Sequence, residues 1–436
     1  MNFLWLALVV GAVLMGGWQG HLQEVTDASF EMTKKAVIET AFPLIGIMAL
    51  WLGIMRLAER AGLVALLARG LRPLLRRLFP DVPPEHPAMG SMVMNIAANM
   101  LGLGNAATPL GLRAMKDLES LNRNPGTATD AMCTFLAINT SSVQIVPVTA
   151  MAILAANNSK NPSAIVGTSL IATGCACLCG VTTARLLARL PIFKLPPPEG
   201  AGVAAATAAG EKPVVREAAG LKPLGGRGAV IMAAFFLYFC WLFYGLLVAP
   251  PAAGAAATPL VRLVNAISQL LVPFLLAVFP LYAWLRGVKI YEEFVDAAKE
   301  GFEVAIRIIP YLLAMLVAIG MFRAAGGIAM LSDWLRPALS AIGFPVDLLP
   351  MVLMRPLTGS GTLATFTDLA HQFGGDSLLA RTAGTIYGST ETTFYVLAVY
   401  FGSVAVRKTR YAIIAGLTAD AVSVIVAIFL CRAVFG

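Results

Sequence analysis

Residues 43–53 read PLIGIMALWLG, and residues 310–320 read PYLLAMLVAIG. Both stretches begin with proline, continue with mostly aliphatic side chains and end with glycine. They lie in the apolar segments 36–57 and 302–321, which are close to the roughly 20 residues that a helix needs to cross a bilayer. An amphipathic segment, 21–35, precedes the first of them, and we expect it to lie at the membrane surface. The sequence therefore predicts two related transmembrane helices, one in each half.

The similarity between the halves continues beyond these helices in order and in spacing. The same register places Arg56 on Arg323, and after a small gap Leu-Arg-Pro at 71–73 meets Leu-Arg-Pro at 335–337. Each half then has a short apolar segment that runs into small polar residues, followed by a span with a polar interruption. The short segments are 89–109 and 349–367, and the interruptions are 139–142 and 388–393.

The composition is that of a membrane protein. Of the 436 residues, 58% are hydrophobic and 13% are charged, whereas about 25% of the residues of a soluble domain are charged. The net charge of +8 would suit a nucleic acid. However, the basic residues lie in short loops between apolar segments, as they do on the cytoplasmic side of membrane proteins. We therefore expect the lipid bilayer as a partner and no nucleic acid.

The loop charges give one orientation for a multi-pass membrane protein. The loops at 60–77, 185–227, 286–299 and 407–410 are rich in Lys and Arg, whereas the loop at 249–258 has no charge. Because cytoplasmic loops carry the excess of basic residues, the basic loops are expected inside and the uncharged loop outside. The N-terminus is then inside and the C-terminus outside.

In this topology the two halves have opposite orientations. The span 36–57 runs inward, whereas its counterpart 302–321 runs outward. We therefore predict an all-α polytopic membrane protein of two inverted repeats, with re-entrant hairpins, broken transmembrane helices and about eight full spans. The first half covers 1–195, a cytoplasmic linker 196–227, and the second half 228–436. Inverted repeats with interrupted helices are typical of secondary transporters, whose site lies near the middle of the membrane.

The first half has polar residues where apolar ones are expected. Asn95 and Asn99 lie one helical turn apart, glycines follow, and Thr108-Pro109 can restart a helix, which predicts a re-entrant hairpin. These groups can bind a polar solute or a cation, or the Asn side chains can form ordinary bonds between helices. The candidate site residues here are Asn95, Asn99, Asn105, Thr108, Asn139, Thr140, Ser141, Ser142 and Gln144.

The second half has a matching hairpin at 355–365, where a Gly-Ser-Gly sequence allows close backbone approach. Arg355 at its edge can hold an anionic group, or it can pair with Glu391 or Asp368. The candidate site residues here are Arg355, Ser360, Thr362, Thr365, Ser389, Thr390, Glu391 and Thr392.

Glu391 is the most informative single residue, because it lies deep in an otherwise uncharged span. A carboxylate there costs about 2.5 kcal/mol or more on insertion scales. It can bind Na⁺, carry a proton or accept hydrogen bonds from a solute, or it can form a structural salt bridge. Asp420 in the last span is a second buried acid. We expect no cofactor beyond Na⁺ or H⁺ as a candidate coupling ion.

Catalysis is not expected from this chain. Its three histidines lie in predicted loop or interfacial segments, and no Walker loop is present, so we predict neither an enzyme nor an ATP-driven pump. Cys175, Cys177 and Cys179 lie close together in an apolar segment. They favour tight helix packing, with a metal site as the alternative. The sequence leaves open whether copies form a homo-oligomer.

Two longer motifs resemble a known family. Residues 86–109, HPAMGSMVMNIAANMLGLGNAATP, and residues 135–142, FLAINTSS, are similar to spore maturation protein A. Residues 387–402, YGSTETTFYVLAVYFG, are similar to spore maturation protein B. The resemblance implies two fused Gate, or nucleoside recognition, domains, which also occur in concentrative nucleoside transporters and in ferrous-iron transport proteins. It implies a transporter-like fold and, in spore formers, a link to dehydration of the spore core.

We therefore predict a secondary transporter of a small polar solute, for which a nucleoside-like compound is one candidate, coupled to Na⁺ or H⁺ through Glu391. One alternative is a membrane scaffold or sensor that transports nothing and serves spore maturation or the cell envelope. A metal-ion permease that uses Cys175 and Cys179 is the other.

Overall fold

The computed structural model describes residues 2–102, 104–194, 221–248, 258–341 and 343–436. These residues are mostly helical, and none of them belongs to a β-strand. Of the predicted linker 196–227, the part up to residue 220 lies outside the described residues. The same is true of nearly all of the predicted outer loop 249–258.

The helices follow the order that the sequence predicts. The first half contains α1 (Asn2–Gln19), α2 (Leu22–Lys34), α3 (Phe42–Arg60), α4 (Leu63–Leu78), α5 (Pro87–Met100), α6 (Gly104–Glu119), α7 (Asp130–Ser141), α8 (Val148–Ala156) and α9 (Ile165–Ala188). The second half contains α10 (Gly226–Val248), α11 (Pro259–Leu285), α12 (Ile290–Ala324), α13 (Gly327–Ala341), α14 (Leu349–Met354), α15 (Gly359–Phe373), α16 (Leu378–Tyr387), α17 (Thr393–Gly402) and α18 (Ala412–Phe435).

Five helical segments of the described chain are long and apolar enough to cross a bilayer. They are Leu22–Arg60, Pro162–Ala188, Gly226–Val248, Pro259–Leu285 and Ala412–Phe435. Two further predicted spans are divided by the predicted interruptions, one into α7 and α8 and the other into α16 and α17. The chain is therefore an all-α, multi-pass membrane protein, as predicted.

Residues 21–35 do not form a separate surface helix. Instead, α2 passes through a π-helical stretch, Lys35–Ala41, directly into α3. Pro43 lies at the start of α3, and proline lacks the N–H group that a regular α-helical bond needs. A wider π turn before the proline keeps the helix continuous. The polar residues of α2 therefore extend a membrane helix, and α2 packs against α12.

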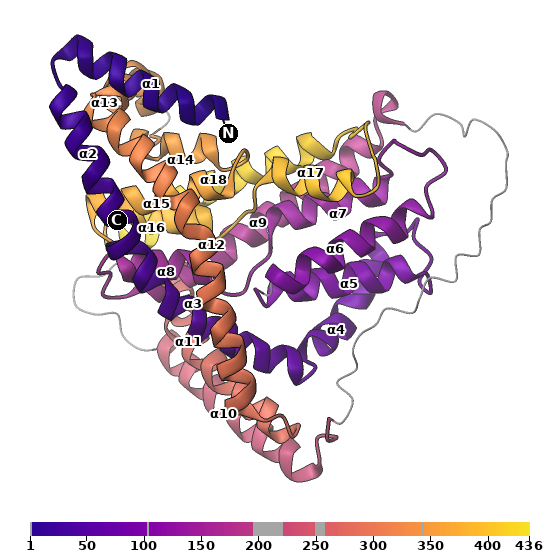
Figure 1. Cartoon of the computed structure of the whole chain (residues 1–436). Coiled ribbons are helices and arrows are strands. Elements are labelled where there is room, and N and C mark those ends of the chain that lie inside the picture. Colours follow the sequence, from indigo (N-terminus) through magenta and orange to yellow (C-terminus); the bar gives the residue numbers. More distant parts are fainter. Residues whose placement is uncertain (1, 103, 195–220, 249–257, 342) are drawn as a thin grey trace.

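The corresponding helices α3 and α12 are antiparallel neighbours (Figure 1). Gly53, late in α3, packs so closely on Phe294, early in α12, that a Cβ atom would lie 2.5 Å from its ring. In the same way, Gly320, late in α12, lies so close to α2 that a Cβ atom on Gly320 would lie 2.3 Å from the Met32 side chain. Because the late part of each helix meets the early part of the other, the two repeats are inverted.

The last helix of each half and the first part of each broken helix also pair reciprocally, as a two-fold axis requires. The last helices of the two repeats, α9 and α18, pack on each other, and Gly180 of α9 allows the close approach of Ala419 of α18. Furthermore, α7 packs on α18 while α16 packs on α9. Each broken helix is therefore enclosed by elements of both halves.

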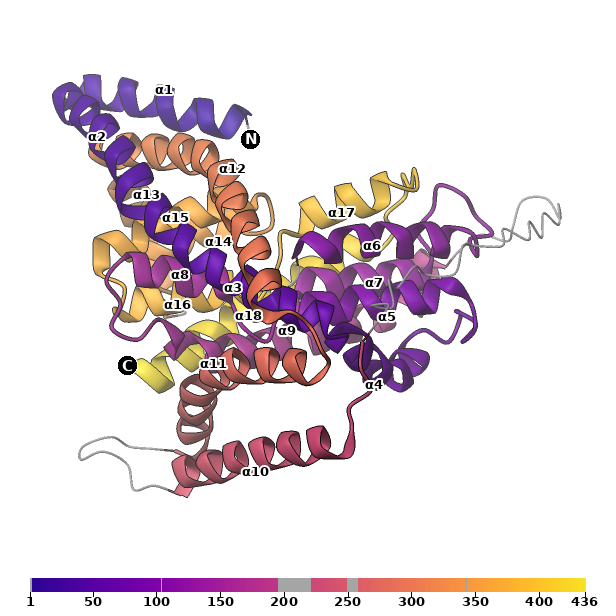
Figure 2. The same cartoon turned by 60° about the horizontal axis from the view of Figure 1, so that its bottom comes forward.

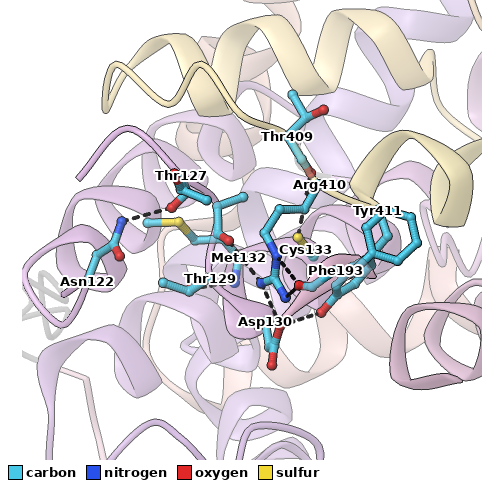
Figure 3. Close-up of polar contacts among 11 residues, drawn as sticks. Asn122, Thr127, Thr129, Asp130, Met132, Cys133, Phe193, Thr409, Arg410 and Tyr411 are labelled. Carbon is cyan, nitrogen blue, oxygen red and sulfur yellow. Dashed lines mark hydrogen bonds and ion pairs between the residues drawn. The ribbon is translucent and has the colours of Figure 1, made fainter. Parts of the chain in front are cut away.

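Two polar clasps, one near each end of the broken helices, tie the halves together. In the first, the Arg410 guanidinium binds Asp130 Oδ1 at 2.6 Å and the Phe193 carbonyl, and the Tyr411 hydroxyl donates to Asp130 Oδ1 at 2.8 Å. Figure 3 shows Arg410 and Tyr411, which follow α17, converging on Asp130 at the start of α7. Thus the basic loop 407–410 is fixed on the first half.

The second clasp has the reverse connectivity. Asp376, in the turn before α16, accepts from the Ser159 hydroxyl at 2.7 Å and from the Lys160 amide at 2.9 Å. It also binds Arg381 of its own half at 3.1 Å. Here an acid of the second half holds the loop that follows α8 in the first half. The two clasps therefore repeat one device at opposite ends of the structure.

Helix α10 contributes the clearest lipid-facing surface. It packs mainly against α11 at the edge of the molecule (Figure 2), and Met232 is its one buried residue. Its exposed large side chains are Val230, Ile231, Phe236, Leu237, Tyr238, Trp241, Tyr244 and Val248. Such a helix is stable in contact with lipid, and its Trp and Tyr suit the membrane interface.

Candidate solute-binding site

Both predicted hairpins are present, and each turns back where the sequence has its small polar residues. In the first hairpin, α5 and α6 are joined at Gly102, whose φ of +73° favours glycine. The Met100 carbonyl at this tip accepts a hydrogen bond from the Ile145 amide at 3.0 Å. In the second hairpin, Thr358 caps α15 by accepting from the Gly361 amide at 3.2 Å.

The two helix breaks lie directly against each other. Helix α7 ends at Ser141, and Ser142 has a left-handed φ of 39° before the chain re-enters a helix at Val148. Opposite it, the Glu391 amide, between α16 and α17, donates to the Thr140 carbonyl at 2.7 Å. Backbone groups freed by one break are thus partly paired by the other, which makes unwound backbone tolerable inside a membrane protein.

A cavity of about 300 Å³ lies beside this crossing. Its walls come from α3, from the first hairpin, from the break before α8, and from Glu391 with α17. The lining residues are Met48, Trp51, Leu52, Met55, Asn99, Gly102, Thr108, Asn139, Gln144, Val146, Val148, Thr149, Glu391, Tyr395, Val396, Val399 and Tyr400. Apolar and aromatic walls with a few convergent polar groups are typical of small-molecule sites. Five predicted site residues, namely Asn99, Thr108, Asn139, Gln144 and Glu391, are brought together here.

A network of amide side chains holds the wall of the cavity in place. The Asn139 side-chain oxygen accepts from the Asn99 amide at 2.9 Å and from the Tyr400 hydroxyl at 3.2 Å. Asn139 also donates to the Phe135 carbonyl at 2.9 Å. Asn95 lies behind this layer, where it donates to the Ala107 carbonyl at 2.8 Å. Asn95 therefore braces the hairpin, while Asn99 and Asn139 face the cavity.

Glu391 enters the cavity wall without a fixed partner. Among the described residues, its carboxylate makes no hydrogen bond and no ion pair within 4 Å. Its backbone, in contrast, is fixed by the bond to Thr140. The alternative of a structural salt bridge is therefore not what this structure shows. A carboxylate held on a rigid backbone and facing a cavity is available for a solute or a cation.

Arg355 does not have either of the partners that the sequence suggests. Its guanidinium donates to the Tyr387 carbonyl at 3.0 Å and to the Thr390 hydroxyl at 3.3 Å, and it stacks on the Tyr387 ring. Asp368 pairs instead with Arg323. Arg355 is 3% exposed and does not line the cavity. It therefore stabilises the carbonyl end of α16, as cations do at helix C-termini, and does not hold an anionic solute in this cavity.

Most of the remaining predicted residues bond to neighbouring backbone or side chains. In the second hairpin, Thr362 and Thr365 donate to carbonyls of their own helix, and Ser360 approaches Thr358. At the breaks, Ser141 donates to Ile138, Ser142 accepts from Gln144, and Ser389 bonds to Ser423 at 2.6 Å. The buried hydroxyls of Thr140 and Thr392 have no hydrogen-bond partner among the described residues. The side chain of Asn105 lies outside the described part of the chain.

A second cavity, of about 260 Å³, lies among α12, α14 and α15 of the second half. Its lining includes Arg323 of α12, Asp347, and Thr365, Asp368 and Gln372 of α15. Arg323 corresponds to Arg56 in the repeat, and its Nη1 binds Asp368 Oδ1 at 2.5 Å. The first cavity is lined by α3, the first hairpin and α17, whereas the second is lined mainly by α12 and α15 of the second half.

Sequence reasoning missed the aromatic part of the site. Tyr400 and Tyr395 lie in the apolar run of α17, and Trp51 lies in the repeated motif of α3. All three read as ordinary membrane-helix residues, and only the direction in which they point distinguishes them. Cys175 and Cys179 lie on α9 and line neither cavity.

Fold and site define a class, the polytopic membrane proteins built from inverted repeats around crossed, broken helices. Comparison with known proteins gives this class a family. A family model described as "Gate: Nucleoside recognition" matches residues 41–156, which include the first hairpin and the first break.

Two relatives have similar lengths of match. The chain is 44% identical over 173 residues to spore maturation protein A of Bacillus subtilis (strain 168), which covers 40% of this chain and 88% of the relative. It is 43% identical over 175 residues to spore maturation protein B of the same organism, which covers 40% of this chain and 98% of the relative. The chain belongs to the family of spore maturation proteins A and B.

Proposed function

We propose that this protein is a secondary transporter of a small polar solute in the bacterial inner membrane, with Na⁺ or H⁺ as coupling ion. The observation that carries the proposal is the cavity at the crossing of the two helix breaks. The Glu391 carboxylate in its wall has no partner in the part of the chain that the structure describes. Inverted repeats with discontinuous helices place solute and ion sites at such a position. Carrier function also fits the presence of a second cavity, which is lined by α12 and α15 of the second half.

The chemistry of the lining favours a neutral solute with hydroxyl groups and a flat apolar part. Glu391 can accept hydrogen bonds from hydroxyls, and Gln144 and Asn99 offer amide groups beside it. Trp51 and Tyr400 supply aromatic faces or edges. A nucleoside combines a hydroxylated sugar with a planar base, and the name of the matching family, nucleoside recognition, supports this solute class. The volume of about 300 Å³ is at the lower end for small-molecule sites.

Three further assignments belong to the same proposal. Residues 1–195 form the half that corresponds to spore maturation protein A, and residues 228–436 the half that corresponds to protein B. The solute is moved and not chemically changed, so the protein is a carrier and not an enzyme.

Exchange between the two cavities requires the Arg323–Asp368 pair, which lines the second cavity, to open in part of the cycle.

The proposal is tested by ligand binding to the purified full-length protein in detergent. Thermal shifts would be measured with panels of nucleosides, amino acids, dicarboxylates and sugars, for wild type and for Val148→Trp, which fills the cavity. We expect stabilisation by one neutral hydroxylated class and loss of that stabilisation in Val148→Trp. If no solute stabilises the wild type and reconstituted protein transports none of them, the protein is a scaffold or sensor and the proposal is wrong.

A further inference from the structure

Asp420 is a buried acid that the solute cavity does not use. It lies in the middle of α18 and is 7% exposed. Its Oδ2 atom accepts a hydrogen bond from the Thr393 hydroxyl at 2.6 Å, whereas its buried Oδ1 atom has no hydrogen-bond partner among the described residues. A buried ionised carboxylate is costly unless it is paired. One of its two oxygens is therefore a strong acceptor without a ligand.

A second buried side chain with an unbonded oxygen, Thr140, lies against the same part of α18. Gly416 lies one helical turn before Asp420 on α18, and it faces the methyl groups of Thr393 and Thr140. A Cβ atom at Gly416 would lie 2.8 Å from the Thr393 methyl and 3.5 Å from the Thr140 methyl. The Thr140 hydroxyl is fully buried and has no partner among the described residues. The side chains of Thr140 on α7 and Thr393 on α17 thus both face the stretch of α18 that carries Gly416 and Asp420.

This region shares its walls with the solute cavity. Thr140 directly follows Asn139, and Thr393 comes two residues after Glu391. Asn139 and Glu391 line the cavity, while Thr140 and Thr393 face α18. The hydrogen bond from the Glu391 amide to the Thr140 carbonyl joins the two chain segments that form this wall. A ligand at Asp420 and a solute in the cavity would therefore order the same two segments.

The electrostatic setting favours a single positive charge beside Asp420. Among the described residues, the charged side chains that act on Asp420 are Arg355, which attracts it, and Glu391, which repels it. Arg355 is engaged by the Tyr387 carbonyl and Thr390, and makes no ion pair with Asp420 among the described residues. Two carboxylates and one guanidinium leave one negative charge uncompensated, and one univalent cation would neutralise it. A divalent ion would need more ligands of full charge than this region offers.

We infer that Asp420, with the hydroxyls of Thr393 and Thr140, binds one univalent cation, Na⁺ or H⁺, behind the solute cavity. Either ion would neutralise the carboxylate charge at Oδ1. Carboxylate and hydroxyl oxygens can coordinate Na⁺, and the carboxylate can also carry a proton. Freed backbone and hydroxyl groups at helix breaks are the usual ligands of coupling ions in carriers. A coupling role for this cation rests on the proposed transport function. The binding of the cation itself does not depend on transport.

The test measures cation binding to the purified, solute-free full-length protein. Binding of radioactive sodium and the infrared carbonyl band of protonated carboxyl groups would be recorded for wild type, Asp420→Asn and Thr393→Val. Asp117→Asn is the matched control, because Asp117 lies on α6 and is bonded to Ser91 at the base of the first hairpin. Size-exclusion profiles check that each variant is folded, and Thr393→Val retains the carboxylate if Asp420→Asn fails to fold.

If Na⁺ is the ligand, wild type and Asp117→Asn bind it equally, Asp420→Asn loses the site, and Thr393→Val weakens binding by roughly 10-fold to 100-fold. If H⁺ is the ligand, wild type binds no Na⁺ and shows a protonated carboxyl band that Asp420→Asn removes. Equal Na⁺ binding by Asp420→Asn overturns the inference, and so does the absence of both signals in wild type. Intact cation binding without any solute transport would instead contradict the proposed function alone.

Discussion

The substitution Gly111→Ala tests the packing behind the solute cavity. Gly111 lies on α6, and a Cβ atom there would lie 2.3 Å from the Tyr400 hydroxyl oxygen and 2.9 Å from the Asn95 side-chain nitrogen. In an exposed helix, replacing glycine by alanine stabilises by about 0.5–1 kcal/mol. Here the new methyl group must displace the Tyr400 ring, and overpacking costs about 1–3 kcal/mol. Because the cost of overpacking exceeds the gain in helix propensity, the substitution is expected to destabilise the protein.

The Tyr400 ring has little room to move. It is 6% exposed, stacks on Phe135 at 6.0 Å between ring centres, and its hydroxyl donates to Asn139. We therefore expect Gly111→Ala to lower the melting temperature and also to weaken solute binding, because the displaced ring disturbs Asn139 in the cavity wall. Scanning fluorimetry with and without solute measures both effects.

A matched control is Gly70→Ala on the exposed side of α4, where a Cβ atom would meet nothing within 4 Å. This variant is expected to melt at the wild-type temperature or slightly above it and to bind solute normally. Equal melting temperatures and equal solute affinities for Gly111→Ala and Gly70→Ala would refute the packing argument.

Three further predictions concern the cavity and the two clasps. Tyr400→Phe removes the hydroxyl that donates to Asn139. The loss of this hydrogen bond, about 1 kcal/mol, is expected to weaken solute binding about 5-fold in a titration. An unchanged affinity would contradict this prediction. Asp130→Asn weakens the bond to Arg410, so we expect a lower melting temperature with unchanged solute affinity. Burial raises the pKa of Asp376, but hydrogen bonds from neighbouring amide, hydroxyl and guanidinium groups outweigh it and lower the pKa to about 2. The stabilisation by the Asp376 carboxylate is therefore complete above the unfolded pKa of about 4 and is lost as the pH falls toward 2. The unfolding curves of wild type and Asp376→Asn should converge in that range. A difference in stability that stays constant with pH would argue against this prediction.

The architecture could be predicted because the bilayer constrains it strongly. The lengths of the apolar segments predicted the helices, and the motif at 43–53 and 310–320 predicted the repeat. The orientation that the basic loops indicate stays a prediction. The breaks could be predicted as well, because hydroxyl and acidic side chains such as those at 388–393 are costly in lipid. The continuous helix through Lys35–Ala41 could not, since the charges of α2 resemble those of a surface helix.

The site was less predictable, because it depends on which side chains meet. Glu391 stands out in the sequence by its charge, whereas Tyr400 is hidden in an apolar run. Arg355 is buried at the second hairpin as predicted, but it binds the Tyr387 carbonyl and neither of the predicted acids. The sequence could not show this, because the position of the carbonyl end of α16 relative to the hairpin depends on packing alone. Residues such as Thr362 are polar and well placed in sequence, yet their hydroxyls bond to their own helix.

The most direct test of the proposed transport function is solute uptake into proteoliposomes by wild type and Glu391→Gln, with and without a Na⁺ or H⁺ gradient. Glu119→Gln is the control, because Glu119 lies at the end of α6 outside the cavity. We expect saturable, gradient-dependent uptake by wild type and by Glu119→Gln, and at least a roughly tenfold loss in Glu391→Gln, equivalent to about 1.4 kcal/mol. Uptake and ion dependence of Glu391→Gln equal to those of wild type would contradict the role of this carboxylate in the crossing.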